Sequence, residues 1–116
     1  MNTIEIESHL LRVYCTVSDH AGRQALHEAI IEAAHNAGLS GATVLPAKMG
    51  YSAGGHFYSD LLNETMADRQ PVVVEIVDQP DRIHAFLPAL HALVQGRRLI
   101  TLERAEVVFY QPDDGR

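Results

Sequence analysis

The stretch that decides the fold is residues 41–78, GATVLPAKMGYSAGGHFYSDLLNETMADRQPVVVEIVD. Its ends, residues 42–47 and 72–77, are short apolar runs rich in β-branched residues and flanked by glycine or proline, which predicts two strands. The residues between them show neither helical nor strand periodicity. Such a long connection is uncommon in a small domain and is usually functional or disordered. We therefore expect two strands joined by a long functional loop, residues 48–69.

The residues before this stretch predict a strand and a helix. Residues 1–8 carry no strong pattern, and we expect a loose end there. Residues 10–17 alternate in polarity, which predicts a strand. Apolar residues then recur at helical spacing in residues 26–37, with Asp19 a candidate cap before them and Gly38 the stop signal.

The residues after this stretch predict a second helix and the last strand. Pro80 follows the second central strand and is typical of a helix start. An apolar stripe at helical spacing then extends to Gly96, which ends the helix. Residues 99–102 and 105–110 are expected to be extended, and the polar tail from residue 111 to be frayed.

The predicted order is strand, helix, strand, strand, helix, strand. This order is typical of the α+β class with a split βαβ, or ferredoxin-like (βαββαβ), fold. Its sheet is antiparallel and carries both helices on one face. We expect residues 1–116 to form a single domain with a core of residues 9–110.

Alternation along the strands divides their side chains between two faces. We assign to the helix side the valines Val13, Val44, Val74 and Val107. The opposite face then carries Leu10, Tyr14, Leu45, Val73, Val77 and Val108. That face is too apolar to remain in water. The simplest cover is a second copy of the chain, so we expect a closed homo-oligomer.

The composition indicates an acidic globular protein. The 116 residues carry a net charge of -6, whereas non-specific nucleic-acid binding normally requires a basic surface. No apolar run approaches the roughly 20 residues of a membrane span. The amino terminus lacks the pattern of a signal peptide, and the single Cys15 excludes an internal disulfide framework. We therefore expect a cytoplasmic protein that neither binds nucleic acid nor inserts into a membrane.

Four short segments occur in a recognisable order along the chain. They are GATV at residues 41–44, GYS at 50–52, VEIV at 74–77 and TLE at 101–103. In this order the chain resembles PII-like signalling proteins, specifically the domain-of-unknown-function family 190. The resemblance implies a non-enzymatic regulator that assembles as a homotrimer of ferredoxin-like subunits. It also implies an adenine nucleotide in the cleft between subunits, and a T-loop that contacts a partner protein.

The resemblance places nucleotide-binding residues on both sides of the loop base. Gly41 and Thr43 match the glycine and threonine that flank the adenine and ribose. Gly50 and Tyr51 match the start of the Gly-aromatic-Gly turn at the base of the T-loop. The effector implied is AMP, ADP, ATP or a cyclic nucleotide.

Two arginines are local candidates for the phosphates. Arg97 and Arg98 follow the second helix, and guanidinium groups match phosphate geometry. The alternative is that both only complement the negative end of the helix dipole.

The chain departs from the family pattern at Pro46, Ala47 and Ser52. Related chains often have arginine and glycine at the first two positions, and the turn has glycine at the third. The loss of that arginine removes a phosphate contact, and Ser52 restricts the backbone. These departures weigh against triphosphate binding, and the alternatives are a mono- or diphosphate, a cyclic nucleotide or no nucleotide at all.

The long loop, residues 48–69, carries the expected contacts to a protein target such as a membrane transporter or an enzyme. The candidate contact residues are Tyr51, His56, Phe57 and Tyr58. The alternatives are that His56 is an ordinary solvated residue and that both tyrosines pack the loop onto their own subunit.

Neither metal binding nor catalysis has a recognisable motif. The seven histidines include two pairs, His27 with His35 and His84 with His91, each about two helical turns apart, which is too far to chelate one ion. Cys15 is expected to be a buried hydrophobe rather than a nucleophile. A metal-responsive trimer of the CutA type, with histidines converging across subunits, is one alternative. A small enzyme of ferredoxin-like fold is another.

Overall fold

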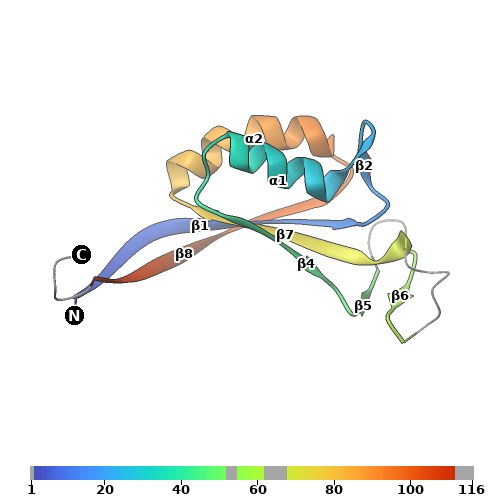
Figure 1. Ribbon diagram of the computed structural model, residues 1–116, viewed down its shortest axis with the longest axis horizontal. Helices are drawn as coiled ribbons and strands as arrows, with labels where there is room; N and C mark the ends of the chain where they lie inside the picture. The colour runs from blue at the N-terminus through green and yellow to red at the C-terminus, as the bar shows by residue number, and fades with distance from the viewer. Residues whose placement is uncertain (1, 52–54, 62–67, 112–116) are drawn as a thin grey trace.

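The computed structural model describes residues 2–51, 55–61 and 68–111. It confirms the predicted α+β class. Four strands form an antiparallel sheet in the order β4-β7-β1-β8, and both helices lie on one face of it (Figure 1). The sheet strands are β1 (Asn2–Thr16), β4 (Ala42–Pro46), β7 (Pro71–Asp78) and β8 (Leu99–Gln111), and the helices are α1 (Leu26–Asn36) and α2 (Pro80–Val94).

Both helices end as the sequence predicts. Gly38, with φ of 76°, follows α1, and Gly96, with φ of 71°, follows α2. Pro80 is the first residue of α2. Asp19, however, does not cap α1, whose N-cap is Ala25. A two-residue hairpin, β2 (His20–Ala21) with β3 (Gln24–Ala25), separates Asp19 from the helix.

The core lies between the helices and the sheet. Its buried side chains are Leu11, Val13 and Cys15 from β1, Val72, Val74 and Ile76 from β7, Leu26, Ile30 and Ala34 from α1, and Ile83, Phe86, Leu90 and Val94 from α2. Cys15 is only 1% exposed, and burial raises the pKa of its thiol to about 11. It is therefore a neutral, buried side chain at neutral pH, as predicted.

The amino terminus is not loose, contrary to the prediction. Residues 2–8 extend β1 and pair with residues 105–111 of β8, from Asn2 opposite Gln111 onward. This two-stranded ribbon projects beyond the helices (Figure 1). The long axis is consequently 54 Å and the radius of gyration 16.6 Å, against about 13 Å for a compact domain of this size. Ile4 and Ile6 alternate with glutamates, which was the strand signal in these residues.

The assignment of Val107 to the helix side is also wrong. Ile100 of β8 lies opposite Val13, whereas Val107 lies opposite Ile6. Because side chains alternate strictly, Val107 is on the open face and Val108 on the helix side. Two adjacent valines cannot reveal which of them faces the core, because only the register of the pairing decides it.

The long loop contains a short hairpin at its base. Met49–Gly50 (β5) pairs with Tyr58–Ser59 (β6), and the N–H of Asp60 donates to the carbonyl of Lys48. The N–H of Ala47 donates to the carbonyl of Pro71, which ties the loop base to β7. Ser52 and residues 62–67 lie outside the described residues. The described part of the loop is therefore anchored where it leaves the sheet.

Asp78 joins the carboxyl end of β7 to the segment that enters β4. Its Oδ2 accepts hydrogen bonds from the N–H and hydroxyl of Ser40, and its Oδ1 accepts the N–H of Gln79. The Nε of Arg82 lies 3.2 Å from Oδ2 of Asp78. Burial alone would raise the pKa of Asp78, but these hydrogen bonds and Arg82 lower it below its ordinary value.

We expect Asp78→Asn to lower the free energy of unfolding by about 1–3 kcal/mol, because a buried charged acceptor of several hydrogen bonds is lost. Since folding lowers the pKa of Asp78, its contribution is complete above the ordinary Asp value of 3.8 and disappears as the pH falls through the folded pKa. Urea titrations at pH 7 and at pH 3 measure this. Asp60→Asn, at an exposed position, is the control. An equal loss at both pH values would contradict the prediction.

The ribbon carries a like-charge contact that predicts the opposite pH dependence. Glu106 lies directly opposite Glu7, and its hydrogen bond with Glu5, together with the charges of Glu5 and Glu7, raises its pKa. We expect Glu106→Gln to raise the thermal midpoint at pH 7, because it removes this repulsion. The gain should disappear below the ordinary Glu value of 4.5, where Glu106 is protonated in both states. Arg104→Gln, which leaves the glutamates in place, should produce no rise.

Candidate functional site

A cleft of about 500 Å³ opens where the amino end of β4 meets β7 and the base of the ribbon. Its lining comes from all four sheet strands and the turns beside them. The lining residues are Ile6, Ser8, Ser40, Gly41, Ala42, Thr43, Glu75, Val77, Asp78, Gln79, Val107 and Phe109. Most of the wall is apolar and a few polar groups converge on it, which is typical of a small-molecule site.

A polar row crosses the largely apolar open face of the sheet and enters this cleft. Thr43 lies opposite Glu75, Glu75 opposite Arg12, and Arg12 opposite Thr101, so one row spans β4, β7, β1 and β8. Side chains that lie directly opposite have Cβ atoms about 4.5–5.5 Å apart. The next row along the strands is Leu45, Val73, Tyr14 and Leu99. The polar row is thus a local exception on an apolar surface.

Arg12 is the centre of this row. Its Nε donates to Glu75 Oε2 at 2.8 Å, and its second guanidinium nitrogen, NH1, donates to Glu103. The hydrogen bonds that Arg12 donates to Glu75 and then to Glu103 raise the pKa of Arg12 above its ordinary value. The side chains of Arg12 and Glu75 are 30% and 29% exposed, so the pair is partly shielded from solvent. One cation therefore holds two carboxylates from different strands.

The predicted nucleotide-binding residues fall into two groups within one chain. Gly41 and Thr43 line the cleft. Gly50 lies at the other end of β4, where Pro71 is its neighbour, and Tyr51 follows it with 74% exposure. Thr43 pairs with Glu75, four residues along β7 from Pro71, so the two groups are roughly 13 Å apart at about 3.3 Å per residue.

The two candidate phosphate arginines differ in their surroundings. Arg98 is held by Asp19, with Nε donating to Oδ2 at 2.6 Å and a second guanidinium nitrogen donating to Oδ1. Burial would raise the pKa of Asp19, but Arg98 and the N–H of Thr16 lower it overall. Arg97 is exposed, and among the described side chains its guanidinium group hydrogen-bonds to that of Gln95. Of the two, Arg97 is the more available for an anion.

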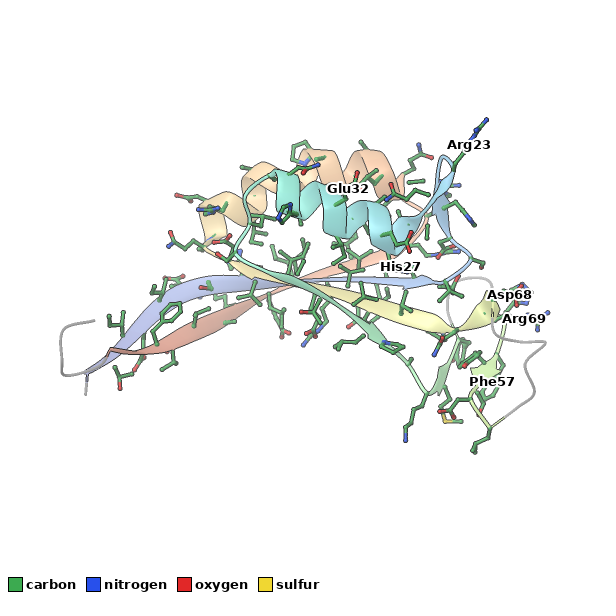
Figure 2. All side chains as sticks on the ribbon, viewed as in Figure 1. Arg23, His27, Glu32, Phe57, Asp68 and Arg69 are labelled. Carbon is green, nitrogen blue, oxygen red and sulfur yellow. The ribbon has the colours of Figure 1, made fainter. Side chains whose placement is uncertain are left out.

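The aromatic residues of the loop also differ in exposure. Phe57 is 49% exposed and lies at the end of the molecule opposite the ribbon (Figure 2), and His56 is exposed beside it. Tyr58 is only 8% exposed. Tyr58 is therefore packed within its own chain, which is the arrangement that the alternative interpretation of the two tyrosines expects. Tyr51, His56 and Phe57 remain exposed.

The described residues contain no group of three or more His, Cys, Asp or Glu side chains that could hold a metal ion. His27 lies on α1 (Figure 2), and the ring of His84 on α2 lies 5.4 Å from that of His9 on β1.

Neither helix is long and apolar enough to cross a membrane in the part of the chain that the structure describes.

The sequence prediction missed several residues that line the cleft. Glu75 and Val77 are on the same strand face, two residues apart, and both lie in the cleft with Thr43. Alternation in PVVVEIVD places Val77 on the open face and puts Glu75 there as well, but their position beside Thr43 depends on the pairing of β4 with β7. The contributions of Ile6, Val107 and Phe109 depend on the unpredicted ribbon.

Comparison of the chain with known proteins identifies its family. Residues 8–107 match the model of domain-of-unknown-function family 190 (DUF190), described as "Uncharacterized ACR". A UPF0166 protein of Aquifex aeolicus (strain VF5) is 32% identical over 104 residues, which cover 90% of this chain and 96% of the relative.

Solved structures of CPII, a nitrogen regulatory PII-like protein from Thiomonas intermedia K12, share the fold. The apo form has a TM-score of 0.62 at 11% identity, covering 94% of this chain and 100% of CPII. The form bound to ADP, AMP and bicarbonate has a TM-score of 0.59 at 10% identity, covering 92% and 99%. The chain therefore belongs to domain-of-unknown-function family 190 and has the PII-like form of the ferredoxin-like fold.

Proposed function

We propose that this protein is a non-enzymatic PII-like regulator whose effector carries an adenosine group that binds in the cleft. The observation that carries the proposal is the position of Gly41 and Thr43. Both match residues of the family pattern, and both line the cleft on the open face of the sheet. The binding of ADP and AMP by CPII, which has the same fold, supports adenine nucleotides as the ligand class.

The binding site is completed by a second copy of the chain. Gly50 and Tyr51 are too far from Thr43 to surround the same small ligand within one subunit. A neighbouring copy that covers the open face brings its own loop base to the cleft of the first. That arrangement also buries exposed apolar side chains such as Leu45, which is 44% exposed, and Leu99, which is 62% exposed. We infer a homotrimer, the closed assembly that the family resemblance implies.

The charges of the cleft determine which part of the effector it holds. Its described lining includes two carboxylates, Glu75 and Asp78, and neither Lys nor Arg. A phosphate group is therefore disfavoured there, whereas a base and a sugar can use the apolar wall and the hydrogen-bonding groups. The phosphates extend out of the cleft toward the neighbouring subunit, where the exposed Arg97 is a cation that can bind them.

The loop transmits the bound state to a target protein. Tyr51, His56 and Phe57 are exposed on it, and exposed aromatic residues are common anchors in protein interfaces. Because the loop base carries Gly50 and Tyr51, an effector that contacts these residues in one copy changes the conformations available to the loop. Ligand-dependent ordering of a segment is a known switching mode.

We expect calorimetric titration of the wild-type protein to show binding of at least one of AMP, ADP, ATP and cyclic AMP. Thr43→Val should weaken that binding by roughly 5- to 10-fold, because one buried hydrogen bond is lost. Thr101→Val is the matched control, since Thr101 is in the same row but outside the cleft. If none of the four nucleotides produces heat or a thermal shift, the proposed ligand class is wrong.

The assembly has its own test. Light scattering after size-exclusion chromatography should give three times the 12.8 kDa mass of one chain. Leu45→Asp should convert the trimer to smaller species, because a carboxylate in a buried apolar interface lacks compensation. Leu61→Asp, at a loop position that is 90% exposed, should leave the mass unchanged. A monomeric wild-type protein at micromolar concentration would overturn the trimer.

A further inference from the structure

We propose that Arg12 is a positioning residue for the effector: it holds Glu75 so that one carboxylate oxygen faces the cleft and accepts hydrogen bonds from the sugar hydroxyls. This inference rests on the proposed function, since it concerns the same cleft. It goes further by naming the group of the ligand that Glu75 recognises and the residue that makes this recognition possible.

The geometry of Glu75 leaves one oxygen available. Its Oε2 accepts the hydrogen bond from Arg12 Nε at 2.8 Å. No other hydrogen bond to the Glu75 side chain occurs within the described part of the chain, so Oε1 is left without a partner there. Glu75 lines the cleft beside Thr43, whereas Arg12 does not line it. A ligand in the cleft therefore meets a carboxylate whose other oxygen, Oε2, is held by Arg12.

Arg12 is itself fixed by a second carboxylate. Its guanidinium group donates to Glu103 on β8 as well as to Glu75 on β7. A planar guanidinium with two partners on opposite sides has little rotational freedom, and a lysine could not reproduce both contacts at these positions. The Glu75–Arg12–Glu103 chain thus restrains a side chain that would otherwise have several rotamers available on an open sheet face.

The ligand group that fits this arrangement is a neutral donor. An anionic group is disfavoured beside the carboxylates of Glu75 and Asp78, whereas two adjacent sugar hydroxyls are neutral and can both donate to one carboxylate. Carboxylates that accept ribose hydroxyls are a recurrent device in nucleotide sites of other folds. Because Arg12 offsets the charge of Glu75, the cleft can present this acceptor without the cost of an unpaired carboxylate.

The experiment compares AMP with 2′,3′-dideoxy-AMP by calorimetry, so that only the sugar hydroxyls change. We expect the wild-type protein to bind AMP more tightly by roughly 10- to 100-fold, the usual range for hydrogen bonds to a charged acceptor. In Arg12→Met this ratio should fall to about threefold or less, while the affinity for the dideoxy compound stays nearly constant. Glu75→Gln should lower the ratio in the same direction.

Two further variants separate positioning from a general loss of structure. Arg104→Met makes the same substitution on β8 outside the cleft and should keep the wild-type ratio. Arg12→Lys keeps the charge and should give an intermediate ratio, and it decides the question if Arg12→Met fails to fold. An unchanged ratio in both Arg12 variants, or a wild-type ratio near one, overturns this inference and leaves the proposed function standing. If the wild-type protein binds another of the four nucleotides but not AMP, the same comparison is made with that nucleotide and its analogue that lacks the free sugar hydroxyls. If it binds none of the four, both the inference and the proposed function are overturned.

Discussion

The pairing of β1 with strands on both of its sides is the constraint on which the rest of the structure depends. β7 and β8 are paired with β1 in one uninterrupted register each. A shift of one residue in either ladder would exchange the two faces of that strand. The present register places Leu11, Val13 and Cys15 under the helices and Arg12 on the opposite face. The hydrophobic core and the polar row are therefore two results of the same alternation.

This constraint also explains why charged residues are tolerated on an apolar face. Arg12, Glu75 and Glu103 lie on three adjacent strands, so each charge is within reach of an opposite one. If the face is covered by a second copy, these groups lose solvent together, and a paired network loses less than an isolated charge would. Their partial exposure in one chain, and the surrounding leucines and valines, are consistent with a surface that becomes buried on assembly.

The parts of the fold that could be predicted from sequence are those specified by local pattern. The two helices, which end just before Gly38 and Gly96, and the strand from Pro71 follow from periodicity and from the conformational limits of glycine and proline. The ribbon was missed because Ile4 and Ile6 alternate over too few residues to stand out without their partner strand. The face of Val107 and the position of Glu75 beside Thr43 depend on pairing between segments far apart in sequence. No local pattern contains that information.

The separation of the two groups of candidate nucleotide-binding residues follows from the rigidity of β4. Gly41 and Thr43 are at its amino end, and the loop base with Gly50 is tied to Pro71 beyond its carboxyl end. A strand paired along its length cannot fold back to bring these ends together, since each residue adds about 3.3 Å. A ligand of the size of a nucleoside monophosphate can be enclosed by both groups only if they come from different copies. In such a site, binding of the effector and contact between subunits are linked, because the same residues complete both. The loop leaves the sheet at the carboxyl end of β4, beside the residues that complete the site. A change in effector binding or in subunit contact would therefore act on the loop.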